Sequence, residues 1–201
     1  MAEHLILLAA GSARRFGSNK LLRPLNGKPL YAHGLAALLA AAKMRPAADV
    51  TVVSRTPEIL AAARAAGARA VESPLSEQGL SFTIKAALDA LEPLAEGDYL
   101  LFAVADQPYL TAASVAALLE KAAPPTRGAT LCFGEKVGSP TLFSASLAQD
   151  LRALKGDSGG RAVLCALGDK CLRVQAESAR ELEDIDLPEQ LPAPGEKESQ
   201  K

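Results

Sequence analysis

The sequence lacks the residues on which several classes of protein depend. It has three cysteines, two histidines and no tryptophan in 201 residues, and only 4% of its residues are aromatic. Cys132, Cys165 and Cys171 form no Cys-x-x-Cys pair, which argues against a disulfide framework or a cysteine-based zinc site and favours reduced thiols. With His4 and His33 as the only histidines, a Ser-His-Asp hydrolase is hard to build.

An excess of one charge and long apolar runs are also missing. The 22 Lys and Arg residues nearly balance the 23 Asp and Glu residues, which argues against electrostatic binding to nucleic acid or to a membrane surface. No apolar run approaches the roughly 20 residues needed to span a bilayer. Residues 1–10 lack the basic start and the cleavage pattern of a signal peptide. We therefore expect a cytoplasmic protein with neither a nucleic-acid nor a membrane partner.

The sequence does contain an alternation of short apolar runs and longer stretches rich in Ala and Leu. Hydrophobic residues make up 49% of the chain, and its length favours one domain. The alternation is typical of repeated βαβ units, so we expect an α/β fold with a mainly parallel sheet. The predicted strands are residues 5–10, 50–54, 68–71 and 99–105. The predicted helices are residues 29–42, 58–66, 81–91 and a segment capped by Thr111 that runs to about residue 121.

The predicted elements become shorter beyond Pro124 and Pro125. We expect strands at residues 130–133 and 140–143, and helices near residues 145–154 and 160–167. This half of the chain is predicted to shape a binding pocket. The last ten residues, 192–201, are rich in Pro, Gly, Glu and Lys and have little to bury, so they are predicted to be a disordered tail after a single domain over 1–191.

A glycine-bearing basic loop follows the first predicted strand. It reads LAAGSARRFGSNK over residues 8–20, at the strand end where open α/β sheets bind ligands. Gly11 and Gly17 permit close backbone approach, and Arg15 and Lys20 can neutralise phosphate charge. The spacing fits neither the Walker A motif nor G-x-G-x-x-G. We interpret the segment as a polyphosphate-binding loop, with an ordinary basic surface loop as the alternative.

Two acidic motifs are candidates for a metal site. Asp106 follows the long apolar strand and precedes Pro108, where a carboxylate is well placed to hold Mg²⁺ together with nucleotide phosphates. Near residue 185, alternation puts Asp184 and Asp186 on one face of an extended segment. Either could complete the site, and we favour Asp186. The alternatives are a turn residue for Asp106 and plain surface acids for the later pair.

Taken in order, these motifs resemble those of the molybdenum cofactor cytidylyltransferases, within the molybdopterin nucleotidyltransferase-like NTP transferases. The resemblance covers residues 5–191. The segments that carry it are residues 8–20, 24–30, 79–81, 106–108, 138–140, 156–161 and 184–189. The Leu-Ala-Ala-Gly opening at residues 8–11 differs from the Leu-Ala-Gly-Gly usual in the related guanylyltransferases, so Ala10 favours CTP over GTP.

The resemblance implies a three-layer, Rossmann-like nucleotidyltransferase fold with a nucleotide-binding part over 1–123 and a smaller acceptor-binding part over 124–191. The implied reaction is Mg²⁺-dependent transfer of CMP from CTP to the terminal phosphate of molybdenum-loaded molybdopterin, with release of pyrophosphate. A recipient molybdoenzyme or its chaperone is an implied partner. Since the acceptor phosphate is already ionised, no general base is required.

The resemblance also assigns roles to individual residues. The catalytic residues that it implies are Arg15, Lys20 and Asp106, with Mg²⁺ held by Asp106 and Asp186. The implied nucleotide-binding residues are Leu8, Ala9, Ala10, Gly11, Arg15, Gly17, Lys20, Gly79, Ser81 and Thr83. The implied acceptor-binding residues are Gly138, Ser139, Asp157 and Arg161.

Some positions depart from the family pattern. Ala13 stands where Ser is common, Ser139 where His is common, Phe82-Thr83 where small hydroxyl residues are usual, and Gly160 where Ala is common. Ser139 matters most, because it falls in the implied acceptor pocket. Three alternatives therefore stay open: a guanylyltransferase that uses GTP, a nucleotidyltransferase acting on a sugar phosphate or alcohol phosphate, and a non-catalytic cofactor-delivery protein.

Overall fold

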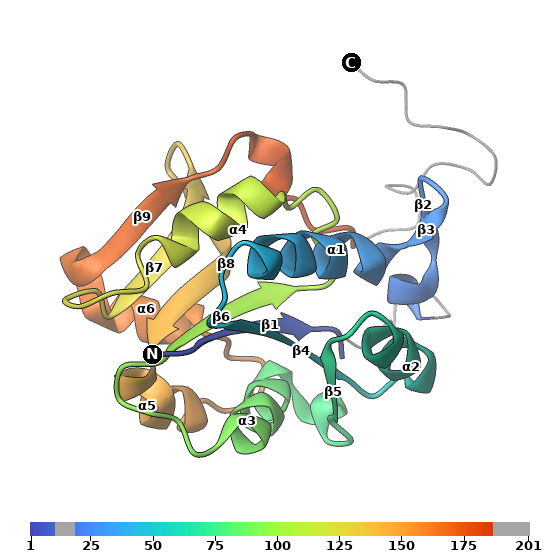
Figure 1. Ribbon diagram of the computed structural model, residues 1–201, viewed down its shortest axis with the longest axis horizontal. Helices are drawn as coiled ribbons and strands as arrows, with labels where there is room; N and C mark the ends of the chain where they lie inside the picture. Colours follow the sequence, from blue (N-terminus) through green and yellow to red (C-terminus); the bar gives the residue numbers. More distant parts are fainter. Residues whose placement is uncertain (11–18, 187–201) are drawn as a thin grey trace.

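The computed structural model describes residues 1–10 and 19–186 of the chain. Its seven main strands are β1 (Glu3–Leu8), β4 (Ala48–Ser54), β5 (Arg69–Glu72), β6 (Tyr99–Val104), β7 (Gly128–Phe133), β8 (Lys136–Ser144) and β9 (Cys171–Gln175). They form one twisted sheet in the order β5-β4-β1-β6-β8-β7-β9 (Figure 1). Only β8 runs antiparallel to its neighbours, so the sheet is mainly parallel, as the sequence predicted.

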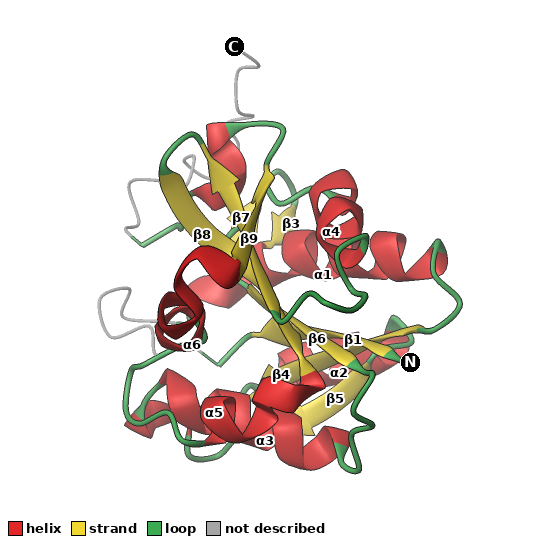
Figure 2. Cartoon of the chain, turned by 90° about the vertical axis from the view of Figure 1, so that its left-hand side faces the viewer, coloured by secondary structure: helices red, strands yellow, loops and turns green. Residues whose placement is uncertain are grey.

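Helices cover both faces of this sheet. The helices α1 (Leu30–Lys43), α2 (Pro57–Ala65) and α4 (Ala112–Leu119) pack on one face, and α3 (Leu80–Leu91), α5 (Ala148–Arg152) and α6 (Arg161–Leu167) pack on the other. Figure 2 shows the sheet edge-on, with α1 and α4 above it and α3 and α5 below. The protein is therefore a three-layer α/β structure.

The alternation of side chains along β1 explains why both layers form. Leu5 and Leu7 belong to the apolar cluster under α1, α2 and α4, whereas Ile6 and Leu8 belong to the cluster under α3, α5 and α6. Successive side chains of a strand point to opposite faces of the sheet. A run of consecutive apolar residues therefore needs helices packed on both faces to keep its side chains from water. The strands β1 and β6 are buried in this way at the middle of the sheet.

A short hairpin connects the first loop to α1. It consists of β2 (Pro24–Leu25) and β3 (Lys28–Pro29), and its two turn residues, Asn26 and Gly27, have φ values of 49° and 79°. Positive φ at both positions is the requirement of a type I′ turn, which Asn-Gly meets at little cost. The hairpin follows the 3₁₀ turn η1 (Lys20–Leu22) and fixes the direction in which α1 starts.

The predicted elements are present, and in the first half their ends differ from the structure by one or two residues. Thr111 caps α4 as predicted, because its side chain accepts a hydrogen bond from Ser114 N. In the second half, β8 begins earlier than predicted, and the segment 145–154 holds the 3₁₀ turn η3 (Ala145–Leu147) and only five α-helical residues. The strand β9 was not predicted, because Val174 is its one fully buried side chain.

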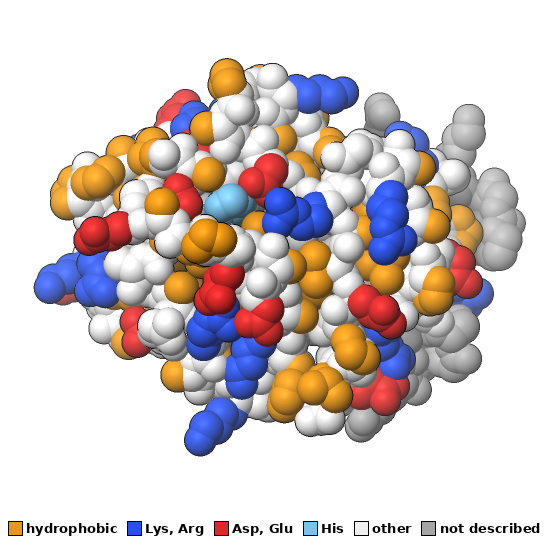
Figure 3. Space-filling view, turned by 60° about the horizontal axis from the view of Figure 1, so that its bottom comes forward, with side chains coloured by type: hydrophobic (Ala, Val, Ile, Leu, Met, Phe, Trp, Pro, Cys, Tyr) orange, Lys and Arg blue, Asp and Glu red, His pale blue; other side chains and the backbone are white. Residues whose placement is uncertain are grey.

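The structure agrees with the charge and apolar patterns of the sequence. Within residues 1–10 and 19–186, no helix is both long enough and apolar enough to span a bilayer. On the face shown in Figure 3, acidic and basic side chains are intermixed rather than gathered by sign. On the side of α3, for example, Arg152 pairs with Asp89 and Glu92.

Candidate functional site

The candidate site begins where β1 and β6 end side by side. The backbone N–H of Ala9 donates to Val53 O at 2.8 Å, and that of Ala105 donates to Leu8 O at 3.1 Å. These bonds continue the sheet for one residue past the strands, and the chain then turns away at Asp106. The turn leaves the Asp106 carboxylate partly exposed at the carboxyl edge of the sheet. This is the edge at which open α/β sheets bind ligands.

Lys20 is the first residue of η1 and lies at the same carboxyl edge of the sheet. Asn19 caps this turn, since its Oδ1 accepts from Leu21 N at 3.1 Å, while its side-chain amide donates to Thr56 Oγ1 at 2.8 Å. The ammonium of Lys20 then donates to Asp106 Oδ2 at 2.8 Å, to Asp186 Oδ1 at 3.0 Å and to the backbone oxygen of Ile185 at 3.0 Å. The structure thus brings together three residues predicted to act jointly, although they come from the beginning, the middle and the end of the chain.

The charges around this ammonium determine how it titrates. Burial by itself lowers the pKa of Lys20, but the neighbouring carboxylates of Asp106 and Asp186 outweigh burial and raise that pKa above its ordinary value. The side chain of Lys20 is only 11% exposed. Lys20 is therefore a fixed positive charge throughout the neutral range.

Asp184 adds a third carboxylate to this cluster. Burial, followed by the negative charges of Asp106 and Asp186, raises the pKa of Asp184, while a hydrogen bond with Gln107 and the charge of Lys20 act in the opposite direction. Among the described residues, three carboxylates thus face one ammonium, so the charge that these four side chains contribute is negative.

The same cluster has the chemistry of a cation site that is completed by a ligand. Oxygen donors with surplus negative charge suit Mg²⁺ or Mn²⁺, which take one or two carboxylates and complete their shell with phosphate oxygens and water. In the described part of the chain, no group of three or more His, Cys, Asp or Glu side chains is arranged to hold a metal by itself. Asp106 and Asp186 therefore fit a cation that arrives with a phosphorylated ligand better than one bound permanently by protein alone.

A cavity of about 230 Å³ opens beside this cluster, and we call it the strand-end pocket. Four residues predicted to bind nucleotide, other than Lys20, lie in its wall: Leu8, Ala10, Gly79 and Thr83. The other lining residues are Lys20, Leu21, Ser76, Glu77, Leu80, Val104, Ala105, Asp106 and Asp157. Ala9 and Ser81 are buried and are not part of the wall. The predicted residues Gly11, Arg15 and Gly17 lie outside the described residues.

The start of α3 forms one side of the strand-end pocket through a tight backbone contact. Gly79 has a φ of 128°, and a Cβ atom there would lie 2.2 Å from the carbonyl carbon of Gly156. The N–H of Ser81 donates to Gly156 O at 3.0 Å. This contact seats Asp157 in the wall of the strand-end pocket, although Asp157 was predicted to contact the acceptor.

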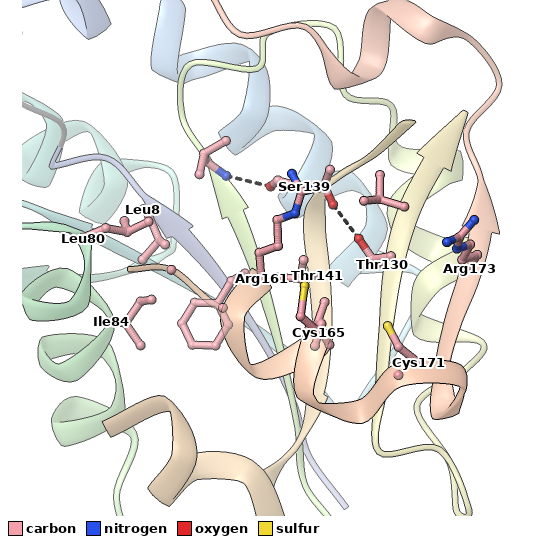
Figure 4. A pocket seen from close by; sticks show the side chains of 18 residues that line it. Leu8, Leu80, Ile84, Thr130, Ser139, Thr141, Arg161, Cys165, Cys171 and Arg173 are labelled. Atoms are coloured by element: carbon pink, nitrogen blue, oxygen red, sulfur yellow. Dashed lines mark hydrogen bonds between the residues drawn. The ribbon is translucent and has the colours of Figure 1, made fainter. Parts of the chain in front are cut away.

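A second cavity of about 430 Å³, which we call the adjoining pocket, shares Leu8, Leu80 and Val104 with the first. Gly138, Ser139 and Arg161, all predicted to bind the acceptor, line it. Figure 4 shows the Arg161 side chain extending toward Ser139. Ser139 Oγ accepts from Val104 N at 3.3 Å, and the bond bridges the separating ends of β6 and β8.

Gly159 and Gly160, from the 156–161 motif that was expected to face the acceptor, also line this pocket. The rest of its wall was not predicted from the sequence, and it comprises Ile84, Phe102, Thr130, Val137, Thr141, Leu164, Cys165, Gly168, Cys171 and Arg173. Figure 4 places Leu8, Leu80 and Ile84 on one side of the cavity and Thr130, Cys171 and Arg173 on the other. The apolar residues among them follow the ordinary core pattern of strands and helices, so no sequence signal separates them from other core residues.

Comparisons with known proteins agree with this architecture. The family model of the MobA-like NTP transferase domain matches residues 5–171. The purine catabolism protein PucB of Bacillus subtilis (strain 168) is 31% identical over 198 residues, which cover 92% of each chain.

Solved structures give the same result for the fold. A nucleotidyl transferase from Methanothermobacter thermautotroptrophicus matches with a TM-score of 0.76 at 24% identity over 92% of each chain. Rv0371c of Mycobacterium tuberculosis H37Rv, solved in complex with manganese, matches with a TM-score of 0.66 at 20% identity over 89% of this chain and 90% of its own. At these identities the two structures establish the shared nucleotidyltransferase fold.

Proposed function

This chain belongs to the MobA-like NTP transferase family and is a nucleotidyltransferase-family enzyme, and from that premise we propose that it transfers CMP from CTP to the terminal phosphate of molybdenum-loaded molybdopterin. The observation that carries the proposal is the Lys20 ammonium, held within 3.0 Å of Asp106 and Asp186 at the strand-end pocket, which shares part of its wall with the adjoining pocket. A transferase with two anionic substrates needs such a charged centre where the substrates meet.

In the proposed reaction, an oxygen of the acceptor phosphate forms a bond to the α-phosphorus of CTP. The bond from that phosphorus to the oxygen bridging the α- and β-phosphates breaks, and pyrophosphate leaves with the electron pair. No proton has to be removed from an ionised phosphate. The protein therefore has to position two anions that repel each other and to neutralise the charge that develops on the leaving group.

The charged residues of the site suit these two tasks. We assign Lys20 to the α-phosphate and the departing pyrophosphate, and its raised pKa keeps it protonated. Asp106 and Asp186 would hold a divalent cation, which we propose is Mg²⁺ and which supplies Lewis-acid neutralisation of phosphate charge when bound. We assign Arg15 to the β- and γ-phosphates on the basis of its position in the basic loop alone.

We propose that the strand-end pocket receives the nucleotide and the adjoining pocket the acceptor. Ala10 lines the strand-end pocket, and Ala rather than Gly at this position is the feature that favours CTP. The cytosine would lie near Gly79 and Thr83 at the start of α3. Asp157 lines this pocket as well, which supports a role for it near the nucleotide rather than only near the acceptor.

Arg161 supports the proposal for the adjoining pocket. It opens α6, lines the cavity and forms no ion pair with an acidic side chain among the described residues. An arginine with that freedom can form a bidentate contact with a phosphate group. A recipient molybdoenzyme or its chaperone would take up the product. The part of the chain over 124–191 would thus serve the acceptor, and the part over 1–123 the nucleotide.

The proposal is tested by measuring pyrophosphate release with Mg²⁺, molybdenum-loaded molybdopterin and each of CTP, GTP, ATP and UTP. Release that requires the acceptor and is fastest with CTP is the expected result. Faster release with GTP would identify a guanylyltransferase. Release with a sugar phosphate or an alcohol phosphate, but not with the pterin, would replace the acceptor. Binding of CTP without release in any combination would favour a delivery protein.

A further inference from the structure

Asp186 lies at the end of a segment with little regular structure. The 3₁₀ turn η5 (Ala179–Leu182) is followed by residues 183–186, which belong to no helix or strand. The position of the Asp186 carboxylate beside Lys20 therefore depends on individual contacts that anchor this segment. Glu181 makes four of these contacts.

Glu181 is a buried acid whose carboxylate is satisfied entirely by hydrogen-bond donors. The residue is 1% exposed and forms no ion pair within the described part of the chain. Its Oε1 accepts from Glu177 N at 2.9 Å and from Ser178 N at 3.4 Å. Its Oε2 accepts from Thr111 N at 3.0 Å and from Thr111 Oγ1 at 2.9 Å. A buried carboxylate is tolerated only where such donors replace water, so its geometry is strongly restricted.

These bonds tie η5 to the start of α4. Thr111 is the N-cap of α4, and its hydroxyl both donates to Glu181 and accepts from Ser114 N at 3.1 Å. The bonds to Oε1 of Glu181 belong to the other end of this connection, where Ser178 and Glu181 form a capping box at the start of η5. Glu181 therefore fastens the segment that carries Asp186 to a helix packed on the central sheet.

The segment then runs from this anchor to the charged cluster. Leu182 and Ile185 are buried in the main apolar core, and Leu182 O accepts from Lys136 Nζ at 3.0 Å. Ile185 N donates to Asp106 O at 2.9 Å, and Ile185 O accepts from Lys20. Asp186 follows directly and meets the ammonium of Lys20.

We propose that Glu181 is a positioning residue, which holds Asp186 in place beside Asp106 and Lys20 so that the pair of carboxylates can take a divalent cation. The inference rests on the nucleotidyl transfer proposed above and extends it to a residue that touches neither substrate. Loss of the Glu181 carboxylate should free η5 from Thr111 and let Asp186 move away from Asp106.

The test compares E181Q with D98N, a matched control. Asp98 is also a buried carboxylate that accepts two backbone N–H bonds, from Ala2 and Ala95, but it lies before β6, at the opposite end of that strand from Asp106. Both variants keep the shape of the side chain and lose part of its accepting capacity. Mn²⁺ is titrated into each CTP-saturated protein, and free Mn²⁺ is followed by electron paramagnetic resonance.

We expect E181Q to bind Mn²⁺ at least about tenfold more weakly than the wild type, which is the range seen when a residue supporting a metal ligand is lost. In the pyrophosphate assay kcat should fall similarly, while KM for CTP changes little. D98N should lower Tm yet leave Mn²⁺ affinity and kcat unchanged. Unaltered Mn²⁺ affinity in E181Q, or an equal loss in D98N, would overturn the positioning role.

Two further arrangements keep the test decisive. If E181Q does not fold, E181D, which retains the charge but is one methylene shorter, is measured instead with the same expected direction. If the wild type binds Mn²⁺ but releases no pyrophosphate with any substrate pair, the proposed function fails, while the Mn²⁺ comparison still decides the role of Glu181. Wild-type protein that binds no Mn²⁺ overturns the positioning role.

Discussion

Lys20 is the residue on which the electrostatics of the site converge. Its ammonium contacts two carboxylates and one backbone oxygen, so it already neutralises part of the negative charge that the described carboxylates contribute. A group with this position can serve the ground state, by attracting the nucleotide, or the transition state, by neutralising the leaving pyrophosphate. Only the second role accelerates the chemical step.

The substitution K20M separates these roles. We expect kcat for pyrophosphate release to fall by about 10²-fold or more, because a positioned charge is lost where negative charge develops. The dissociation constant for CTP should rise by less than about tenfold. Single-turnover kinetics and calorimetric titration of CTP measure the two quantities. An effect confined to CTP binding would contradict the assignment, and K20R, which keeps the charge in another geometry, is the control.

Asp98 gives a prediction about pH that is independent of the site. Burial by itself raises the pKa of Asp98, but hydrogen bonds from Ala2 N and Ala95 N and the charge of His4 outweigh burial and lower that pKa below its ordinary value. A lowered pKa in the folded state means that Asp98 stabilises the fold above about pH 4 and that this stabilisation is lost as the pH falls through the folded-state pKa.

We therefore expect D98N to lower the free energy of unfolding by about 2 kcal/mol at pH 7, because two hydrogen bonds to a charged group are weakened. The difference between D98N and the wild type should shrink as the pH is lowered from 5 to 2. Urea unfolding across this range measures it. A difference that stays constant with pH would mean that the native carboxylate contributes nothing through its charge.

The sequence predicts individual residues of the site but not the residues that hold them in position. Lys20, Asp106 and Asp186 belong to motifs whose residue types suit phosphate and metal chemistry, and the structure brings them together. Glu181 carries no such signal, since an acid near a chain turn is ordinarily a surface residue. Its burial depends on donors from Thr111, 70 positions away in sequence, and only the folded chain reveals such a pairing.

At the scale of elements, the junction of α3 with residues 156–160 links the two pockets. Gly79 and Gly156 are in backbone contact, Asp157 lines the strand-end pocket, and Gly159, Gly160 and Arg161 line the adjoining pocket. The glycines permit this close approach: a Cβ on Gly159 would lie 2.7 Å from Leu80 Cδ2. A shift of this junction would therefore disturb both cavities together.

The substitution G79A tests this junction. Its Cβ would meet the backbone of Gly156 at 2.2 Å, and backbone atoms yield less than flexible side chains, so we expect a loss of more than about 2 kcal/mol of stability together with weaker CTP binding. G67A is the control, because Gly67 also has a positive φ but a Cβ atom there would meet nothing within 4 Å. It should lose only about 1 kcal/mol through backbone strain.

Thermal melting and a CTP titration of the two variants supply the comparison. Equal losses in G79A and G67A would mean that positive φ, rather than the contact with Gly156, accounts for the glycine at position 79.

The elements differ in how far their sequence determines them. The strand β6 and the last four residues of β1 are apolar on both faces, because helices cover both sides of the sheet there, and the two strands were predicted to within two residues. The edge strand β9 has one neighbour and exposed side chains at Leu172, Arg173 and Gln175, so its sequence carries no clear period. The length of β8 is set by pairing with both β6 and β7, which no local pattern encodes.

At the scale of the whole molecule, both pockets lie along the seam between the parallel part of the sheet and its antiparallel part. Leu8 and Val104, which the pockets share, close the strands β1 and β6, while Ser139 comes from β8, where the direction changes. The alternation of strands and helices predicted the parallel part. It could not predict the reversal at β8, which creates the adjoining pocket by spreading β8 away from the end of β6.

A ligand at this seam contacts both parts of the sheet, so its binding should stabilise the whole fold. At a CTP concentration of 100 times its dissociation constant, with Mg²⁺ present, binding adds about 2.7 kcal/mol, which for a chain of this length raises Tm by roughly 5 to 10 °C. Removal of the metal with EDTA should reverse most of this shift, because Asp106 and Asp186 would then face the phosphates without a cation between them.

D106N, whose carboxylate is replaced by an amide, should melt near the wild type without ligand and show a smaller metal-dependent shift. If CTP stabilises the wild type equally with Mg²⁺ and with EDTA, the carboxylates at the ends of β6 and of the 183–186 segment do not hold a metal for the nucleotide, and Lys20 and Arg15 would have to balance its charge without one.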